Sequence, residues 1–297
     1  MIIRYRAAVL VTIWLALSVL PARPALAYFE RFFVSTRTFS LGGAFVALAD
    51  DASATVSNPA GLTQIRSWSF LSSYVRPYDL SELGEYYVAA AVPSRLGALG
   101  ISWHRFALDD VMSEDVITLA YGRDYIRTSQ DASLSFGGSI DIARVDIRDT
   151  FNDSRTVVTG SLSVLLRPFS IIGLGYTIRN IGQPSFDFVA GGGKTSLKTT
   201  QAVGLAYHWR ERFVLLLQTD KGQDGRWRDG LGTEYLATGE LTLRAGLTAG
   251  DVTGGVGLQV SGVSVDLGVT SHEVLGVSYL LSVGFALPQD TPEGAEW

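Results

Sequence analysis

The feature that most constrains the fold of this chain is a side-chain period of two, which recurs from about residue 67 to residue 285. In residues 263–270, four aliphatic side chains alternate with Ser, Asp, Gly and Thr, and residues 275–285 repeat the pattern with Leu280 as the exception. Successive side chains of a β-strand point to opposite faces, so each segment has one apolar and one polar face. The pattern predicts an all-β protein.

Two classes of β-protein show this alternation, the soluble β-sandwich and the transmembrane β-barrel. The polar faces here consist of small or charged residues, which suit a narrow aqueous lumen. Aromatic residues gather at segment ends, as at Trp103, Tyr121, Tyr125, Tyr207, Trp209, Tyr279 and Phe285. Because aromatic side chains prefer the bilayer interface, these positions favour the barrel.

Fourteen alternating segments can be counted: 67–76, 84–93, 97–108, 115–125, 131–144, 155–167, 171–180, 198–209, 211–219, 228–237, 240–249, 252–261, 262–271 and 274–285. Short turns and longer polar loops alternate between them, as in a bacterial barrel with both termini on the periplasmic side. The prediction is a 14-stranded antiparallel transmembrane β-barrel over residues 67–287.

The first 27 residues have the three parts of an export signal. Arg4 and Arg6 give a positive start, residues 7–20 are apolar, and small residues stand at positions 25 and 27. The apolar run is shorter than the ~20 residues that a membrane-spanning helix needs. We therefore expect cleavage after Ala27 and a place in the cell outer membrane of a Gram-negative bacterium.

Charge and cysteine content exclude several functions for the exported chain. Loss of Arg4, Arg6 and Arg23 with the signal leaves 21 basic and 29 acidic residues, a net charge of −8. Nucleic-acid binding needs a basic surface, so no nucleic-acid partner is expected. The chain has no cysteine, which rules out disulfides and thiolate metal sites.

Residues 28–66 do not follow the strand pattern and predict a compact plug, or hatch, inside the lumen. Residues 41–57 are small and apolar, and Asp50 and Asp51 stand where they could cap a short helix. Asn58-Pro59 is a turn signal that would end this helix, and Gly61 permits a further bend. Residues 288–297 are acidic, carry Pro288 and Pro292, and are expected to form a loose periplasmic tail.

The segment GGAFVALADDASATVSNPAGL, residues 42–62, closely resembles the FadL-like outer-membrane proteins, in particular the PorV/PorQ branch. The resemblance implies a barrel that passes fatty acids or other hydrophobic molecules, with the NPA segment as a movable hatch. It places Asn58, Pro59 and Ala60 on that hatch, together with the neighbouring Gly61, Asp50 and Asp51. PorV-type members instead serve type IX secretion.

Two functions follow from the resemblance and stay open. The first is passive transport of fatty-acid-like, hydrophobic or amphipathic small molecules through an outer-membrane barrel in contact with lipid. The second is a partner-binding role with secretion-system or envelope-assembly proteins. The outer loops are shorter than those of typical fatty-acid transporters, which argues against a large external lipid site.

Several polar residues fall on the predicted inward faces of the strands. They are His104, Asp141, Arg179, His208, Gln218, Arg244 and Asp266. Charges at membrane depth must face the interior or water, so we expect these side chains to pair within the lumen. They form either a polar path for a solute or a network that holds the barrel and the plug together, and we favour the network.

The remaining motifs do not support a cofactor, a metal or an enzyme. GGGKTS at residues 191–196 lacks the first glycine of a phosphate loop, because Phe188 stands there. The HEVLG segment from His272 lacks the second histidine of a zinc site. Residues 220–229 resemble a calcium loop, but Gly222 and Leu231 occupy ligand positions, so a solvated turn is favoured over weak calcium binding.

Overall fold

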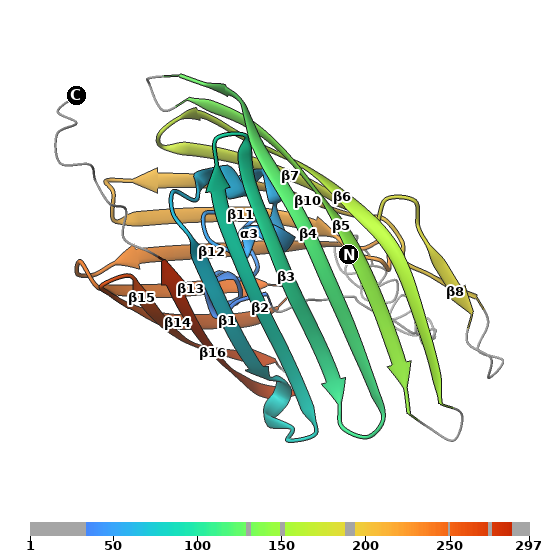
Figure 1. Cartoon of the computed structure of the whole chain (residues 1–297). Helices are drawn as coiled ribbons and strands as arrows, with labels where there is room; N and C mark the ends of the chain where they lie inside the picture. The colour runs from blue at the N-terminus through green and yellow to red at the C-terminus, as the bar shows by residue number, and fades with distance from the viewer. Residues whose placement is uncertain are drawn as a thin grey trace, which may run out of the picture.

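The computed structural model describes residues 34–128, 132–148, 152–187, 194–248, 250–272 and 275–286. Fourteen strands form a closed antiparallel barrel in which β1 pairs with β16 (Figure 1). They are β1 (Ser69–Arg76), β2 (Leu83–Ser94), β3 (Gly97–Leu108), β4 (Met112–Arg127), β5 (Ser133–Ile147), β6 (Asp153–Phe169), β7 (Ile172–Arg179), β10 (Thr200–Trp209), β11 (Phe213–Lys221), β12 (Trp227–Leu236), β13 (Leu241–Thr248), β14 (Asp251–Val260), β15 (Val263–His272) and β16 (Gly276–Ala286). The predicted 14-stranded antiparallel barrel is confirmed.

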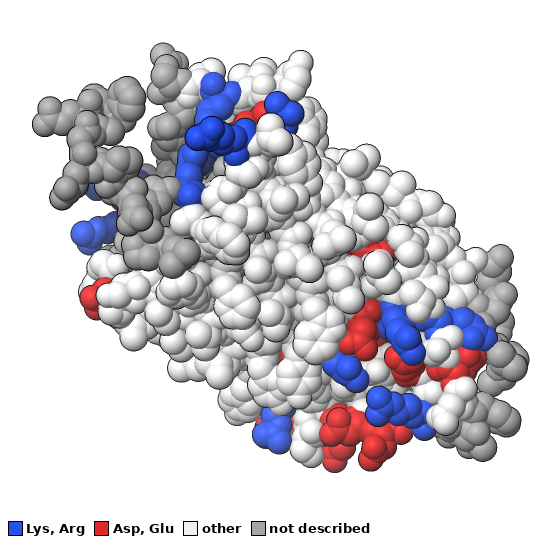
Figure 2. All heavy atoms as spheres, viewed as in Figure 1, with Lys and Arg blue, Asp and Glu red and all other residues white. Residues whose placement is uncertain are grey.

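The outer surface of the barrel carries the apolar face of each strand. Leu205, Leu217, Leu231 and Leu247 are register partners on adjacent strands and form one row around the wall. Figure 2 shows an almost uncharged belt between two charged ends of the molecule. This belt is what a hydrocarbon environment requires of a spanning barrel.

The two ends of the barrel differ. At the turn end, where β1 begins and β16 finishes, short connections such as residues 170–171 and 261–262 join the strands. At the opposite loop end, the longest connection spans residues 180–199 and contains two short strands, β8 (Ser185–Asp187) and β9 (Lys194–Ser196). The fourteen predicted segments do not include these two short strands.

Strands β4, β5 and β6 extend further at the loop end than the sequence pattern predicted. Their outermost pairs are Met112 with Ile147 and Ile147 with Asp153. The alternation is lost there because charged residues such as Arg144 and Asp146 replace apolar ones on the outer face, as expected above the bilayer. The inner face of this raised wall packs against the hairpin residues Phe186 and Leu197 through Val116, Ala143 and Val145.

Residues 34–66, here called the luminal segment, lie inside the barrel and fold into three short helices. These are α2 (Thr36–Ser40), α3 (Ala54–Ser57) and the 3-10 helix η1 (Pro59–Gln64). The Ser35 hydroxyl caps α2 by accepting from the Thr38 amide at 3.0 Å. None of the helices in the described ranges has the length and apolar character needed to cross a membrane.

Several glycines on the inner wall receive the luminal segment. This glycine ring consists of Gly100, Gly122, Gly137, Gly173, Gly175, Gly204, Gly230, Gly232, Gly246, Gly255 and Gly268, and a Cβ at each would collide with an atom of residues 36–62. At Gly137 the obstacle is the backbone of Pro59 and Ala60, and at Gly175 it is the backbone of Val46. The luminal segment therefore packs with its main chain directly on the main chain of the wall.

Apolar side chains fill the space that remains in the lumen. Leu41, Phe45, Leu48 and Leu62 of the luminal segment are buried in one cluster with small wall residues such as Ala206. Residues 28–33 of the predicted plug, the signal peptide 1–27 and the tail 288–297 lie outside the described residues. Their assignments stay predictions.

The glycine ring gives a first test of this packing. Gly137→Val should push Pro59 and Ala60 away from the wall at a cost of about 1–3 kcal/mol, because the new side chain has no space. A cysteine at position 60 of the otherwise cysteine-free chain should then react faster with a water-soluble maleimide. Gly138→Val on the outward-facing neighbour is the matched control. Equal labelling rates in the two variants would contradict the packing described here.

Candidate functional site in the lumen

Asn58 is the central polar contact between the luminal segment and the wall. Its side chain is fully buried, and Nδ2 donates to the Val46 carbonyl at 2.6 Å and to the Val164 carbonyl of β6 at 3.3 Å. Its Oδ1 accepts from the Ala60 amide at 3.1 Å, and the same amide donates to Ser163 Oγ at 2.9 Å. Asn58 thus ties together the two halves of the luminal segment and one side of the barrel.

The other predicted hatch residues lie beside Asn58. Pro59 begins η1, where a residue without an N–H loses no helical hydrogen bond, and its carbonyl lies against Gly122. Gly61 packs against the Ala49 carbonyl, and a side chain at position 61 would collide with it. Ala49 itself adopts a φ of 35°, which is uncommon for a residue other than glycine. The NPAG turn is therefore held in a space with no room for larger residues.

Two of the predicted polar residues on the wall, Gln218 of β11 and Arg179 of β7, bind the main chain of the luminal segment. Gln218 Oε1 accepts from the Phe45 and Val46 amides at 2.9 and 2.8 Å. Arg179 Nη2 donates to the Ser57 carbonyl at 2.8 Å, and its Nε donates to Val56 at 3.2 Å. Both side chains satisfy main-chain groups that would otherwise be buried without partners.

A cluster of charges anchors the luminal segment near the turn end. Arg37 on α2 forms ion pairs with Asp50 at 2.6 Å and with Asp51 at 3.2 Å, both within the luminal segment. The same guanidinium contacts Glu234 of β12 at 2.8 Å. Asp51 also accepts from the Ser53 amide at 2.8 Å in front of α3, and Asp50 serves the ion pair. The predicted capping of this helix by Asp50 and Asp51 was wrong, because its N-cap residue is Ser53 and no side chain caps it.

The cluster continues across the wall to two more predicted residues. Arg244 of β13 donates to Glu234 at 2.6 Å and to Asp266 of β15 at 2.5 Å. Residues 37, 50, 51, 234, 244 and 266 are together called the turn-end ion cluster. Glu234 holds it together because its carboxylate accepts from both guanidinium groups.

The other three predicted lumen residues are not part of this cluster. His104 pairs with Glu85 at 2.6 Å, and both side chains are buried. Asp141 accepts from three hydroxyl groups, of which Thr118 is nearest at 2.7 Å. The ring of His208 makes no hydrogen bond or ion pair within the part of the chain that is described. The predicted lumen residues therefore belong to several separate groups and do not form one shared network.

Some residues of these clusters were absent from the sequence prediction. Glu234 shares the inward parity of Gly230 and Gly232 on β12, so the alternation of that strand contained the signal for it. Glu85 likewise shares the inward parity of Tyr87 on β2, and both residues are buried. No pattern pointed to Arg37, because its partners are set by how the luminal segment folds back on itself.

Cavities lie on both sides of the luminal segment. A loop-end cavity of about 220 Å³ is lined by Phe39, Phe45, Val46, Val56 and Arg179, among others. A turn-end cavity of about 450 Å³ is lined by the turn-end ion cluster. A smaller cavity of about 50 Å³ beside Asp141 shares Val56 and Arg179 with the loop-end cavity. The luminal segment separates the loop-end cavity from the turn-end cavity.

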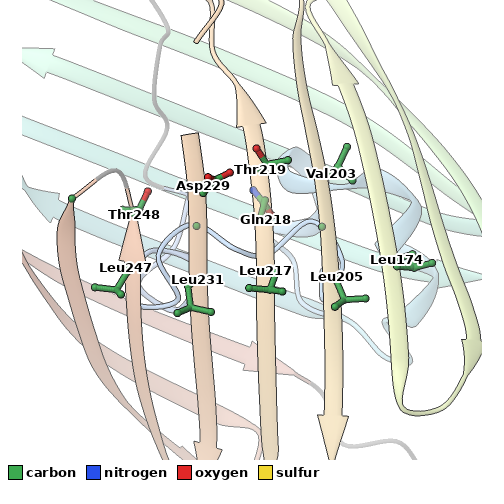
Figure 3. A pocket seen from close by; sticks show the side chains of 13 residues that line it. Leu174, Val203, Leu205, Leu217, Gln218, Thr219, Asp229, Leu231, Leu247 and Thr248 are labelled. Atoms are coloured by element: carbon green, nitrogen blue, oxygen red, sulfur yellow. The ribbon is translucent and has the colours of Figure 1, made fainter. Parts of the chain in front are cut away.

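A shallow hollow of about 650 Å³ lies on the outer wall over β10 to β13. Figure 3 shows Leu205, Leu217, Leu231 and Leu247 side by side along its edge, from neighbouring strands. Behind it the wall carries glycines, and a Cβ at Gly204 would meet Val46 of the luminal segment. A single layer of backbone, hydrogen-bonded without a register break, therefore separates this hollow from the luminal segment.

The described residues hold no group of three or more His, Cys, Asp or Glu side chains arranged to bind a metal ion. Asp220 and Asp224, from the segment that resembles a calcium loop, have other partners. Asp220 accepts from Gln218 at 2.8 Å, and Asp224 pairs with Arg228 at 2.7 Å.

Comparisons with known proteins bear on the fold. No family model matches the chain, and no curated protein matches it. The CymD monoaromatic hydrocarbon channel is 14% identical, with 86% of this chain and 99% of that chain covered and a TM-score of 0.63. The toluene transporter TbuX of Ralstonia pickettii is 11% identical, with 88% and 100% covered and a TM-score of 0.62. The toluene transporter TodX of P. putida is 12% identical, with 86% and 99% covered and a TM-score of 0.62.

At these identities the likeness concerns the fold. It agrees with the predicted 14-stranded barrel, and the assignments to the FadL-like proteins and to their PorV/PorQ branch stay predictions.

Removal of the shared carboxylate tests the anchoring role of the turn-end ion cluster. Glu234→Gln should lower the free energy of unfolding by about 2–3 kcal/mol, because it leaves two largely buried guanidinium groups without a common partner. Urea unfolding in detergent micelles measures the change. The exposed Glu240→Gln on the next turn is the control, with an expected change below about 0.5 kcal/mol. If the two variants had the same urea midpoint of unfolding, the anchoring role of Glu234 would be refuted.

Proposed function

We propose that this protein is a passive channel of the outer membrane for small hydrophobic or amphipathic molecules, with the luminal segment as its gate. The observation that carries the proposal is the luminal segment itself, which separates a loop-end cavity lined by apolar, polar and charged side chains from a turn-end cavity lined by the turn-end ion cluster. The fold shared with CymD, TbuX and TodX supports it, since those proteins are named as hydrocarbon channels or toluene transporters.

The two halves of the luminal segment are attached to the barrel by different means. The α2 end is held by the turn-end ion cluster, while the NPAG turn is held by Asn58, the Ala60 amide and close packing. An ion cluster that spans three strands resists displacement more than a few neutral hydrogen bonds do. The NPAG turn is therefore the part that moves, and residues 34–40 are the anchor.

The lining of the loop-end cavity indicates the kind of molecule that enters. Its apolar part comes from Phe39, Phe45, Val46 and Val56, and its polar part includes Arg179. At about 220 Å³ it lies below the ~300–1,000 Å³ of pockets for drug-sized ligands. A molecule of monoaromatic size suits this cavity better than a long-chain fatty acid.

Uptake into liposomes that contain the purified protein tests the proposal. Labelled toluene should equilibrate faster than in protein-free liposomes. The protein should increase the uptake rate of a fatty acid by a smaller factor, and it should leave the uptake rate of glucose unchanged. Equal rates for toluene with and without protein would refute the transport function. Recovery of secretion-system proteins by crosslinking in intact envelopes would then favour the PorV/PorQ-like partner-binding alternative.

The hatch role of Asn58 predicts a specific change in this assay. Asn58→Ala removes the side chain that donates to Val46 and Val164, so the closed position of the NPAG turn loses about 1–3 kcal/mol. Toluene uptake should rise several-fold while the barrel keeps its heat-modifiable mobility on a gel. The exposed Asn152→Ala, just before β6, is the matched control. Uptake identical to the control would remove Asn58 from the gate.

A further inference from the structure

The arginines at the two ends of the barrel differ in their partners. At the loop end most are neutralised, by the ion pairs Arg76–Asp79, Arg105–Asp115, Arg144–Asp146, Arg155–Asp153 and Arg228–Asp224. At the turn end the exposed Arg95, Arg123 and Arg210 have no carboxylate oxygen within 4.0 Å among the described residues. Figure 2 shows the same contrast, with acidic and basic residues interleaved at one end and mostly basic residues at the other.

Arg123 lies on the outer face of β4, and Arg95 lies in the turn between β2 and β3. Arg123 follows the outward-facing Tyr121 by two residues and has Phe136 as its register partner, so it points away from the lumen. Arg95 lies in the turn beside Leu96, whose carbonyl accepts from the Tyr121 hydroxyl. Arg95 and Arg123, which have no carboxylate partner in the described part of the chain, therefore lie near an aromatic side chain at the edge of the apolar belt.

Arg210, in the turn between β10 and β11, also lies beside an exposed aromatic side chain. The Arg210 guanidinium lies 5.0 Å from the centre of the Trp209 ring, and Trp209 is 50% exposed on the outer face. Trp209 also meets Phe213 edge-on at 6.3 Å. A cation stacked on an interfacial tryptophan is held at the level where lipid headgroups lie.

We propose that Arg95, Arg123 and Arg210, here called the turn-end collar, bind the phosphate groups of anionic phospholipids in the leaflet at the turn end. A guanidinium matches the geometry of a phosphate and forms two hydrogen bonds to it. The loop-end arginines lack this capacity because their donors are used by neighbouring carboxylates. The inference rests on the membrane placement in the proposed function.

Spin-labelled lipids test the collar by electron spin resonance, which measures the association constant of phosphatidylglycerol relative to phosphatidylcholine in mixed vesicles. The unmodified protein should prefer phosphatidylglycerol, with each arginine contributing roughly fivefold at low salt. The double variant Arg123→Gln/Arg210→Gln should lose most of this preference. The control Arg144→Gln/Arg228→Gln, from the paired loop end, should keep it. About 1 M salt should weaken the preference because it screens exposed charges.

Three outcomes would overturn the collar: no preference in the unmodified protein, an unchanged preference in the turn-end variant, or an equal loss in the loop-end control. Toluene uptake in the same vesicles separates this inference from the proposed function. Normal uptake without lipid preference refutes the collar alone, whereas absent uptake with a preserved preference refutes the channel alone.

Discussion

The direct contact between the main chain of the luminal segment and the glycine ring is the constraint on which the rest of the structure depends. At the glycine ring the luminal segment approaches the wall closely, and a single Cβ at Gly137 or Gly175 would occupy space taken by the backbone of this segment. This close approach brings the Phe45 and Val46 amides within reach of Gln218, and the Ala60 amide within reach of Ser163. The glycines that permit the close packing therefore also bring the hydrogen-bonding groups of the wall and the luminal segment together.

Close packing also explains how the polar residues are distributed. Where the wall is glycine, the luminal segment is bound by main-chain contacts, and at the turn end long charged side chains line the turn-end cavity. Arg37 of the luminal segment and Arg244 of the wall share the carboxylate of Glu234. The result is a segment with one charged anchor and one neutral, tightly fitted turn, an asymmetry that suits a gate with a fixed end and a moving end.

Much of the barrel could be predicted from the sequence, because a period of two is a local property of each strand and the apolar face is set by the lipid. Strand bounds agree within three residues of the structure. The prediction failed where the environment changed: above the bilayer, the outer faces of β4 to β6 become charged and the pattern ends early. It also missed β8 and β9, which pack on the raised wall through Phe186 and Leu197. Arg37 could not have been found, since its contacts join segments that are far apart in the sequence.

The central claim is that residues near Ala60 must leave the wall for a molecule to pass. Cysteines at Ala60 and Ser163, whose amide and hydroxyl are 2.9 Å apart, would tether the NPAG turn to β6. The account predicts that toluene uptake by this variant stops under oxidising conditions and returns when the disulfide is reduced. Equal uptake by the oxidised and reduced protein, with the disulfide shown to be formed, would contradict it.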